Sequence, residues 1–409
     1  MNIILFDDKS ADDLLPFTYT RPVAEIRIGI LTIREKWELL FNCKNQTSTI
    51  SRDYLKKKYP LVIAEENLLI NASVCPLPEY LEEILNLGKG QQLVYDDIVI
   101  ALRLSGEELK NIIENTLNKP FKESIHLTDF YKIRTNYKPI QIQHSWDIFT
   151  KNQEALVLDF KELTKGKKSL TISSDNKVFG EENVFLEEGA IVSCSIINAT
   201  TGPVYIGKNA QVMEGCLIRG PFALCEDSTL KMGAKIYGPT TIGPHSKVGG
   251  EVNNSVIFGF SNKAHDGFLG NSVIGEWCNL GADTNTSNLK NNYSEVQIWS
   301  HSLGMNIKTG LQFCGLLMGD HSKTAINTML NTGTVVGVNA NIFGAGFPSK
   351  FIPSFSWGGA ENLTEYSFEK ALEVATIVFE RRKILFDLNE QEILAEIFKL
   401  TQEQRKLHH

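Results

Sequence analysis

The chain has 409 residues, a length that predicts two or three domains rather than one core. Hydrophobic residues make up 42% of the sequence, which is enough to bury sizeable cores and excludes a globally disordered chain. The formal net charge of −7 argues against nucleic acid as a main partner. A small anionic substrate is compatible with this charge, because local basic residues can bind it whatever the total is.

The seven cysteines are scattered and form no C-x-x-C pair. Such a set is typical of a reduced protein and predicts neither a disulfide framework nor a zinc site. The amino terminus has a short apolar run, Ile3–Phe6, that acidic residues stop, which indicates a buried first strand rather than a signal peptide. No stretch approaches the roughly 18 apolar residues of a membrane span. We therefore expect a cytoplasmic protein.

Residues 1–160 alternate between strand-like and helix-like segments, which predicts an α/β layer architecture. The expected strands are Ile3–Phe6, Leu61–Ala64, Leu68–Ile70 and Asp97–Arg103. The expected helices are Ile33–Phe41, Pro78–Leu87 and a third that begins after Ser105, a residue suited to the N-cap. The charged segment Lys161–Lys168 contains a glycine and is typical of a linker.

From about Val178 to Phe347, glycines multiply and an aliphatic residue recurs roughly every six positions. The clearest run is Ile206, Val212, Ile218, Leu224, Leu230, Ile236, Ile242 and Val248. A period of six is neither that of a helix nor that of a simple strand, and it is the signature of a parallel β-helix. Each hexapeptide supplies one side of a triangular coil, and the coils stack as in other solenoids. A glycine-rich β-sandwich is the alternative, but chance rarely holds eight aliphatic residues in register.

The segment Pro348–Gly359 is aromatic and predicted to be irregular. Apolar spacing then predicts a helix over Ser367–Phe386, with basic residues near its end. A second helix is expected from Asn389, where Glu392 completes a start that is similar to a capping box. We expect these helices to cap the open end of the β-helix or to pack on a neighbouring subunit. The expected domains are therefore 1–160, 170–347 and 348–409.

The hexapeptide rhythm breaks once, at Phe260–Asn291, and the residues there carry a resemblance. The run reads Lys263-Ala-His265-Asp-Gly-Phe268-Leu-Gly-Asn and then Asn279-Leu-Gly-Ala-Asp-Thr-Asn-Thr-Ser-Asn288. It resembles the active-site stretch of the bifunctional N-acetylglucosamine-1-phosphate uridylyltransferase/glucosamine-1-phosphate N-acetyltransferase family, and is most similar to the divergent branch of Bacteroidetes-type bacteria. The resemblance implies that the β-helix is left-handed, and that the protein is a homotrimer with acyltransferase sites between subunits.

The same resemblance assigns roles to residues in this run. His265 matches the catalytic histidine, which would take a proton as an amine attacks a thioester; histidine is the usual base at neutral pH. Phe268 matches a tyrosine that contacts the substrate, without its hydroxyl. Asn279 and Asn288 match asparagines that contact the amino sugar, and Lys263 would help with charge. A loop histidine without a role is the alternative for His265.

A later run, from Met318 to Ala325, resembles the coil where family members bind coenzyme A. Asp320 and Lys323 are therefore expected near the coenzyme, with a solvated corner as the alternative for Lys323. His301 and His321 are expected to be structural.

One departure concerns the phosphate of the sugar, because the family has a lysine upstream where this chain has Glu251-Val-Asn-Asn. The phosphate would need other cations, with Lys235, Lys247 and Lys263 as candidates, and the acceptor could be another amino sugar.

The segment from Leu14 to Gly29 resembles the signature of sugar nucleotidyltransferases. In that fold a glycine-rich loop cradles the nucleotide phosphates. Here the loop Asp7–Asp13 has no glycine and is rich in aspartate, and valine replaces the signature lysine. Arg21 or Arg27 could replace it as a phosphate clamp.

The resemblance also implies a Mg²⁺ site in this domain if the domain is active. Ser73 lies where the family has a metal-binding aspartate, and serine is a poor substitute for a carboxylate toward Mg²⁺. We therefore assign no metal ligand in this sequence.

Two functions follow from these observations. The first is an acetyl-CoA-dependent N-acetyltransferase that acts on an amino-sugar phosphate, with or without sugar-1-phosphate nucleotidyl transfer in the α/β domain. The second is a degenerate sugar-nucleotide-binding protein or a β-helix scaffold without catalysis. Both predict small sugar phosphates and nucleotides as partners.

Overall fold

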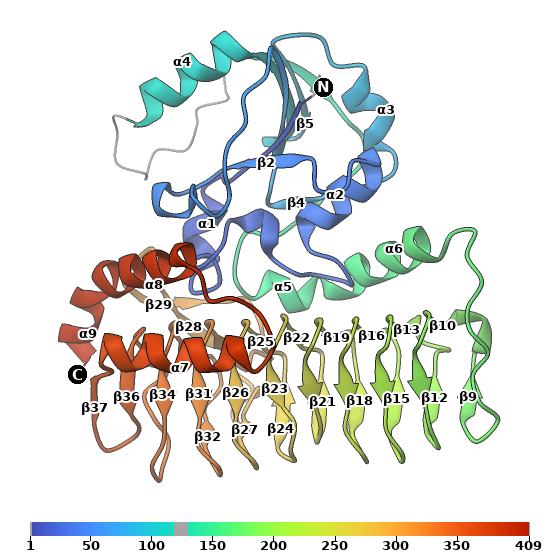
Figure 1. Ribbon diagram of the computed structural model, residues 1–409, viewed down its shortest axis with the longest axis vertical. Coiled ribbons are helices and arrows are strands. Elements are labelled where there is room, and N and C mark those ends of the chain that lie inside the picture. The colour runs from blue at the N-terminus through green and yellow to red at the C-terminus, as the bar shows by residue number, and fades with distance from the viewer. Residues whose placement is uncertain (1, 118–129, 409) are drawn as a thin grey trace. The chain divides into compact units, whose positions relative to one another are not determined.

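The computed structural model describes residues 2–117 and 130–408, and the chain divides into two compact units (Figure 1). The first unit consists of Met1–Leu14, Thr20–Ile26 and Leu31–His144. The second consists of Leu15–Tyr19, Arg27–Ile30 and Ser145–His409. The chain therefore contributes two short early segments to the unit that holds the β-helix.

A six-stranded sheet forms the centre of the first unit, in the order β2-β1-β3-β6-β5-β7. Its strands are β1 (Asn2–Phe6), β2 (Thr47–Ile50), β3 (Glu66–Asn71), β5 (Gln91–Tyr95), β6 (Ile98–Ser105) and β7 (Tyr131–Arg134). β1 runs parallel to β2 and β3, whereas β6 runs antiparallel to β3 and β5. The helices are α1 (Ser10–Asp13), α2 (Ile33–Phe41), α3 (Tyr80–Leu85) and α4 (Gly106–Leu117), and the short strands β4 (Val74–Cys75) and β8 (Ile140–Gln141) pair antiparallel. The expected α/β architecture is confirmed.

Local signals in this unit predicted the strands β1, β3 and β6 and the helices α2, α3 and α4. α2 has the predicted bounds, and α4 begins after Ser105, whose hydroxyl accepts from the Glu108 amide at 3.3 Å. The strand expected at Leu61–Ala64 is wrong. The backbone of this segment bonds to side chains and not to a neighbouring strand: Asn2 Nδ2 donates to the Val62 carbonyl at 2.7 Å.

The second unit contains a parallel β-helix, whose coils run from β9 (Lys177–Phe179) to β36 (Ser356–Gly358). Its nine-stranded face consists of β10 (Val184–Leu186), β13 (Val204–Ile206), β16 (Phe222–Leu224), β19 (Thr240–Ile242), β22 (Val256–Ile257), β25 (Val273–Ile274), β30 (Leu316–Met318), β33 (Thr334–Val336) and β35 (Phe351–Ile352). Its ten-stranded face consists of β11 (Ile191–Val192), β14 (Gln211–Val212), β17 (Thr229–Leu230), β20 (Lys247–Val248), β23 (Asn262–Lys263), β26 (Asn279–Leu280), β31 (Lys323–Thr324), β34 (Asn341–Ile342), β36 and β37 (Leu363–Glu365). Its six-stranded face consists of β9, β12 (Ile196–Asn198), β15 (Leu217–Arg219), β18 (Lys235–Tyr237), β21 (Glu251–Asn253) and β24 (Phe268–Gly270).

All aliphatic residues of the predicted six-residue run are buried in one continuous core, from Ile206 to Val248. The hexapeptide prediction is confirmed, and the coils extend beyond Phe347. The irregular segment predicted at Pro348–Gly359 is wrong, because it contains β35 and β36, and Ile352 continues the buried core in a last coil.

The coils are interrupted by one excursion, which follows β27 (Asn285–Thr286). Residues 287–315 leave the stack and include the antiparallel hairpin of β28 (Gln297–Ser300) and β29 (Met305–Lys308). The chain returns at β30, which pairs with β25, and β27 pairs with β32 (Met329–Leu330). The six-residue rhythm of the sequence therefore breaks before the chain leaves the stack of coils, because β23 to β27 are still coil strands.

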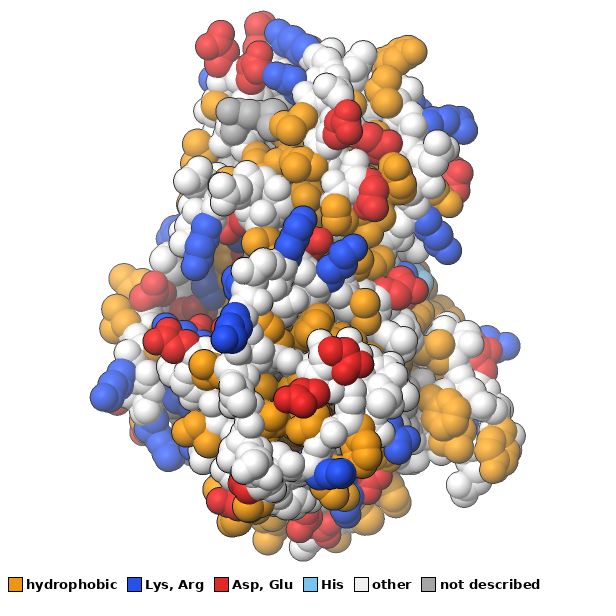
Figure 2. Space-filling model, turned by 90° about the vertical axis from the view of Figure 1, so that its right-hand side faces the viewer, with side chains coloured by type: hydrophobic (Ala, Val, Ile, Leu, Met, Phe, Trp, Pro, Cys, Tyr) orange, Lys and Arg blue, Asp and Glu red, His pale blue; other side chains and the backbone are white. Residues whose placement is uncertain are grey.

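At the open end of the β-helix, the core finishes in the partly buried residues Ile172, Val178 and Ala190. Phe179 and Ile191 point outward there and are 45% and 55% exposed. Figure 2 shows hydrophobic and acidic side chains mixed on the surface that includes this end of the β-helix. Two helices precede the coils, α5 (Asp147–Thr150) and α6 (Asn152–Thr164), so the segment predicted as a linker is helical up to Thr164.

Three helices follow the coils: α7 (Phe368–Glu380), α8 (Leu388–Leu400) and α9 (Gln402–His408). α7 ends before the predicted Phe386, and Asp387 rather than Asn389 caps α8, because its side chain accepts from the Glu390 amide. α7 runs back along the outside of the coils (Figure 1), from the last coil to β26. Of the two places expected for these helices, α8 lies at the open end, where its Phe398 packs on the last coil at Phe355, whereas α7 does not. Packing of these helices on a neighbouring subunit stays a prediction.

Candidate active site

The turn between β23 and β24 presents His265 and Asp266 to solvent. Lys263 precedes this turn and points into the coil, in register with Val248 of the coil before. Its side chain is 3% exposed, and Nζ donates to the His265 carbonyl at 2.6 Å. Burial lowers the pKa of the Lys263 amine to about 8, against the opposing effect of Asp266 and Asp283. Lys263 therefore holds the backbone of the histidine turn from inside.

Gly250 of the preceding coil makes room for this arrangement. It has a φ of +71°, and a Cβ there would lie 2.9 Å from both the His265 carbonyl oxygen and Lys263 Nζ. Gly267 closes the turn with a φ of +117°, and its Cβ would lie 2.3 Å from the Thr284 carbonyl oxygen. A side chain at either position would displace the turn.

Phe268 and Asn288 lie together beside Gly270, where a Cβ would come within 2.6 Å of the Phe268 ring and of the Asn288 amide nitrogen. The Phe268 amide donates to Asn285 Oδ1 at 2.8 Å. Asn288 Nδ2 donates to Asn271 Oδ1 at 2.7 Å. The structure thus brings two of the predicted substrate residues onto one surface, next to the histidine turn.

Asn279 lies on the ten-stranded face instead, exposed and in register with Asn262 on one side and Lys323 on the other. Phe268 belongs to the six-stranded face. The turn with His265 joins these two faces. The predicted residues therefore lie on both sides of one edge of the β-helix, and His265 lies on the edge.

An aromatic ladder follows the corner between the nine-stranded and ten-stranded faces. His245, Phe260, Trp277 and His321 all adopt a left-handed backbone, with φ between 58° and 63°. His245 stacks on Phe260 at 4.8 Å and Phe260 on Trp277 at 4.2 Å between ring centroids. Phe379 of α7 stacks on Trp277 at 3.9 Å and lies 6.0 Å from His321. His321 is 5% exposed in this stack, which agrees with the expected structural role.

Asp320 and Lys323 make contacts with the backbone of the coils. Asp320 is 2% exposed and accepts from the Glu276 amide at 2.8 Å. Lys323 Nζ donates to the His321 carbonyl at 2.7 Å, and burial lowers its pKa. Their contact with a coenzyme stays a prediction.

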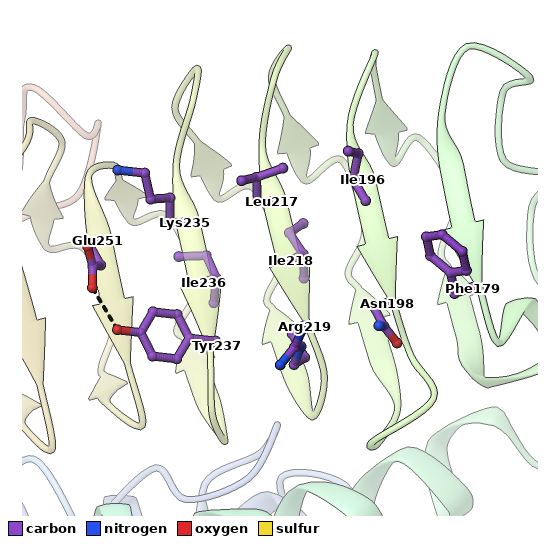
Figure 3. Close-up of a pocket in the computed structure, with 10 residues that line it drawn as sticks. All are labelled: Phe179, Ile196, Asn198, Leu217, Ile218, Arg219, Lys235, Ile236, Tyr237 and Glu251. Carbon is purple, nitrogen blue, oxygen red and sulfur yellow. Dashed lines mark hydrogen bonds between the residues drawn. The ribbon is translucent and has the colours of Figure 1, made fainter.

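The outer surface of the six-stranded face forms a shallow groove of about 420 Å³ (Figure 3). Ile196 and Leu217 form its apolar floor, and Tyr237 donates to Glu251 at 2.6 Å at one end. Glu251 is in register with Phe268, so the groove leads toward the histidine edge. Lys235, one candidate cation, lies in this groove.

In the first unit, acidic residues follow β1 where β3 also ends. Asp7 accepts from the Val23 amide at 2.8 Å and from the Ser51 hydroxyl, and burial raises its pKa to about 6. Asp8 accepts from Asn71 Nδ2 at 3.0 Å and from the Ser73 hydroxyl at 3.2 Å. These bonds occupy the carboxylates within the protein.

Ser73 offers a divalent metal no carboxylate, and the nearby Asp7 and Asp8 are hydrogen-bonded within the protein. The Ser73 hydroxyl contacts Asp8 and Asn71, and it accepts from Gln141 Nε2 at 3.0 Å. Across residues 2–117 and 130–408, no group of three or more histidine, cysteine or acidic side chains could hold a metal ion. Ser73 therefore belongs to a hydrogen-bond network rather than to a carboxylate cluster.

The two arginines proposed as phosphate clamps lie in different units. Arg21 is buried in the first unit, and Arg27, in the second, donates to the Ile30 carbonyl. Arg52 was missed in the sequence. Its guanidinium donates to Asp12 at 2.7 Å and to the Ala11 carbonyl at 2.9 Å, so it offsets negative charge after β1. No motif marks this residue in the sequence, because its partners lie some 40 positions away.

Comparisons with known proteins agree with both parts of the chain. Residues 3–168 match a family model described as sugar nucleotidyl transferase. The bifunctional sugar-1-phosphate nucleotidylyltransferase/acetyltransferase of Sulfurisphaera tokodaii is 28% identical over 171 residues, 41% of this chain and 40% of that protein. The bifunctional protein GlmU of Methanococcus vannielii is 29% identical over 241 residues, 58% of this chain and 51% of that protein.

GlmU of Wigglesworthia glossinidia brevipalpis is 21% identical over 300 residues, 66% of this chain and 61% of that protein. The chain therefore spans about half the length of the curated relatives it matches. Within the described ranges, no helix has both the length and the apolar character needed to cross a membrane.

Proposed function

Because this chain is similar to sugar nucleotidyl transferases over residues 3–168 and to bifunctional proteins such as GlmU, we propose that its β-helix transfers an acetyl group from acetyl-CoA to an amino-sugar phosphate. His265 is the base, and Phe268, Asn279 and Asn288 contact the sugar. The single observation that supports this proposal best is the histidine turn, whose backbone is held from inside by Lys263 while the imidazole faces solvent.

The arrangement suits acyl transfer to an amine. The amine nitrogen forms a bond to the thioester carbonyl carbon, the carbon–sulfur bond breaks, and coenzyme A leaves as a thiol. His265 takes the proton from the attacking nitrogen and returns it to the leaving sulfur. A fixed turn keeps the base at one place during both steps, which is how positioning lowers a barrier. Asparagine amides bind sugar hydroxyls without adding charge.

His265→Ala tests this assignment. We expect acetyl transfer from acetyl-CoA to glucosamine-1-phosphate, or to the preferred amino-sugar phosphate of a panel, to fall by about 10²–10⁴-fold, the range typical of a lost general base. The circular dichroism spectrum should stay unchanged, because the side chain is exposed. His245→Ala is the matched control, since that histidine lies on the same β-helix at another corner. Wild-type activity in His265→Ala would contradict the proposal.

Sugar-1-phosphate nucleotidyl transfer is the second candidate function, and the match of residues 3–168 favours it. The altered loop and the Ser73 network weigh against it, since they offer no carboxylate cluster for Mg²⁺. A panel of sugar-1-phosphates, each with every nucleoside triphosphate and Mg²⁺, decides the question through pyrophosphate release. Pyrophosphate release by the wild type that is faster than release by an Arg52→Gln variant would support nucleotidyl transfer. Binding of UDP- or dTDP-sugars without release would indicate a binding domain.

The proposed assembly is a cytoplasmic homotrimer. The edge with His265 is exposed in one chain, and a second copy would complete the site. Sedimentation equilibrium that gives a monomer at working concentrations would contradict a site shared between subunits.

A further inference from the structure

We propose that the end of α7 forms a phosphate-binding site beside Asn262 and Asn279, with Arg382 as the principal cation. The inference rests on the proposed acyl transfer at His265, since Asn279 belongs to that site. The ligand is a phosphate monoester dianion, carried either by the acceptor sugar or by coenzyme A.

The aromatic ladder fixes the place of this helix end. Phe379 stacks on Trp277 at 3.9 Å with an angle of 22° between the rings. Trp277 is two residues before Asn279, and Phe379 is three residues before Arg382. The stack therefore holds the end of α7 next to the strand that carries Asn279.

Arg382 reaches the neighbouring strand. Its Nη2 donates to Asn262 Oδ1 at 3.4 Å, and Asn262 is in register with Asn279. Arg382 is half-buried, and burial together with the neighbouring Arg381 lowers its pKa. Among the residues that the structure describes, no carboxylate pairs with Arg382. A half-buried guanidinium without a counter-ion is suited to a bidentate phosphate.

The turn after α7 has a lysine, Lys383, at a left-handed position where glycine would be less strained. Lys383 has a φ of 57°, and its amide donates to the Glu380 carbonyl at 2.9 Å. The Ile384 amide donates to the Phe379 carbonyl at 3.1 Å, which completes a Schellman motif. Glycine is the usual residue at this left-handed position. Lysine there makes the third of three successive basic residues, Arg381 to Lys383, despite their mutual repulsion.

A structural explanation accounts for only part of this cluster. Basic residues at a helix carboxyl end interact favourably with the helix dipole, typically by about 0.3–1 kcal/mol. That effect suits Arg381 and Lys383, which are exposed. It does not explain why Arg382 is half-buried and directed at an asparagine on the strand next to Asn279.

Isothermal titration of the full chain tests the site without relying on catalysis. The ligands are glucosamine-1-phosphate against glucosamine, and coenzyme A against 3′-dephospho-coenzyme A. We expect Arg382→Gln to weaken one phosphorylated ligand by about tenfold, the effect of one lost charge-assisted contact. The matched ligand without that phosphate should bind the variant and the wild type equally. The pair that responds identifies which phosphate occupies the site.

Lys383→Gly is the control for the turn, because it removes a charge but keeps the left-handed conformation, and it should bind with near wild-type affinity. Equal affinity of Arg382→Gln and the wild type for both phosphorylated ligands overturns the inference. A wild-type protein that binds neither phosphorylated ligand also overturns it. If the wild type shows no acetyl transfer but binds a phosphorylated ligand that Arg382→Gln binds more weakly, the acyltransferase proposal fails and the phosphate site remains supported.

Discussion

Lys263 is a lysine in a column of aliphatic side chains. Its inward position is taken by Val248 in the coil before, and Leu280 is buried in the coil after. Burying an amine is unfavourable unless its charge is lost or its hydrogen bonds are satisfied. Lys263 Nζ donates to the His265 carbonyl, so this residue gives up some stability of the fold and fixes the histidine turn.

Lys263→Met should remove the cost of burying the amine and increase the stability of the fold at neutral pH. The folded amine has a pKa of about 8, below the ordinary 10.5, so the unfolded chain binds more protons between these values and folding stability rises with pH there. Below pH 8 the wild type therefore lacks about 3 kcal/mol that it regains near pH 10.5. We expect the difference in unfolding free energy, Lys263→Met minus wild type, to shrink as pH rises through this window.

The measurement is urea denaturation from pH 7 to 10.5, followed by the rate of acetyl transfer. Methionine fills a similar volume but cannot donate to the turn, so kcat should fall even where stability increases. A pH-independent difference in stability would contradict the buried-amine interpretation.

At the scale of the element, the tightest feature is the contact between successive turns of the β-helix. The turn after β20 contains Gly250, and the turn after β23 contains His265. Because the coils stack at the spacing of neighbouring strands, a side chain on one turn meets the backbone of the next. The histidine turn thus depends on a glycine in a different coil.

Gly250→Ala should displace that turn. Its added Cβ would lie 2.8 Å from the Asp266 Cα and 2.9 Å from the His265 carbonyl oxygen, closer than real contacts allow. Gly233→Ala is a matched control, because Gly233 lies in the same turn of the preceding coil with the same φ of +71° and has nothing within 4 Å of the added Cβ. Both variants should lose about 1 kcal/mol through the left-handed backbone.

Only Gly250→Ala should also lose acetyl transfer, by about tenfold or more, since small displacements of a catalytic base have large effects on rate. Steady-state kinetics and thermal unfolding of the two variants provide the comparison. Equal activities would show that the turn absorbs the methyl group without moving His265.

At the scale of the whole molecule, the chain does not divide at a single point. Leu15–Tyr19 and Arg27–Ile30 belong to the second unit although they precede most of the first. The Gly29 amide donates to Asn152 Oδ1 at 2.7 Å, and the Gly29 carbonyl accepts from the Thr241 hydroxyl at 2.8 Å. A Cβ on Gly29 would lie 2.5 Å from Asp159 Oδ2. The glycine of the nucleotidyltransferase-like signature thus packs against α6 and the β-helix.

The sequence alone determined the repeating part of this protein. A six-residue period decides which side chains face the core, because each coil repeats the same local geometry and buries the same position. Capping residues such as Thr32 and Ser105 likewise set helix starts through bonds within one turn. The histidine run could be found for the same reason, since His265, Phe268 and Asn288 lie close together in the chain.

Only the tertiary structure decided what surrounds that run. The inward direction of Lys263, the crowding by Gly250 and the approach of Arg382 to Asn262 join segments that are adjacent in space but not in sequence. No local spacing encodes a contact across 120 positions. The path of α7 along the coils depends on the stacking of Phe379 with Trp277, and such packing is visible only when both surfaces are present.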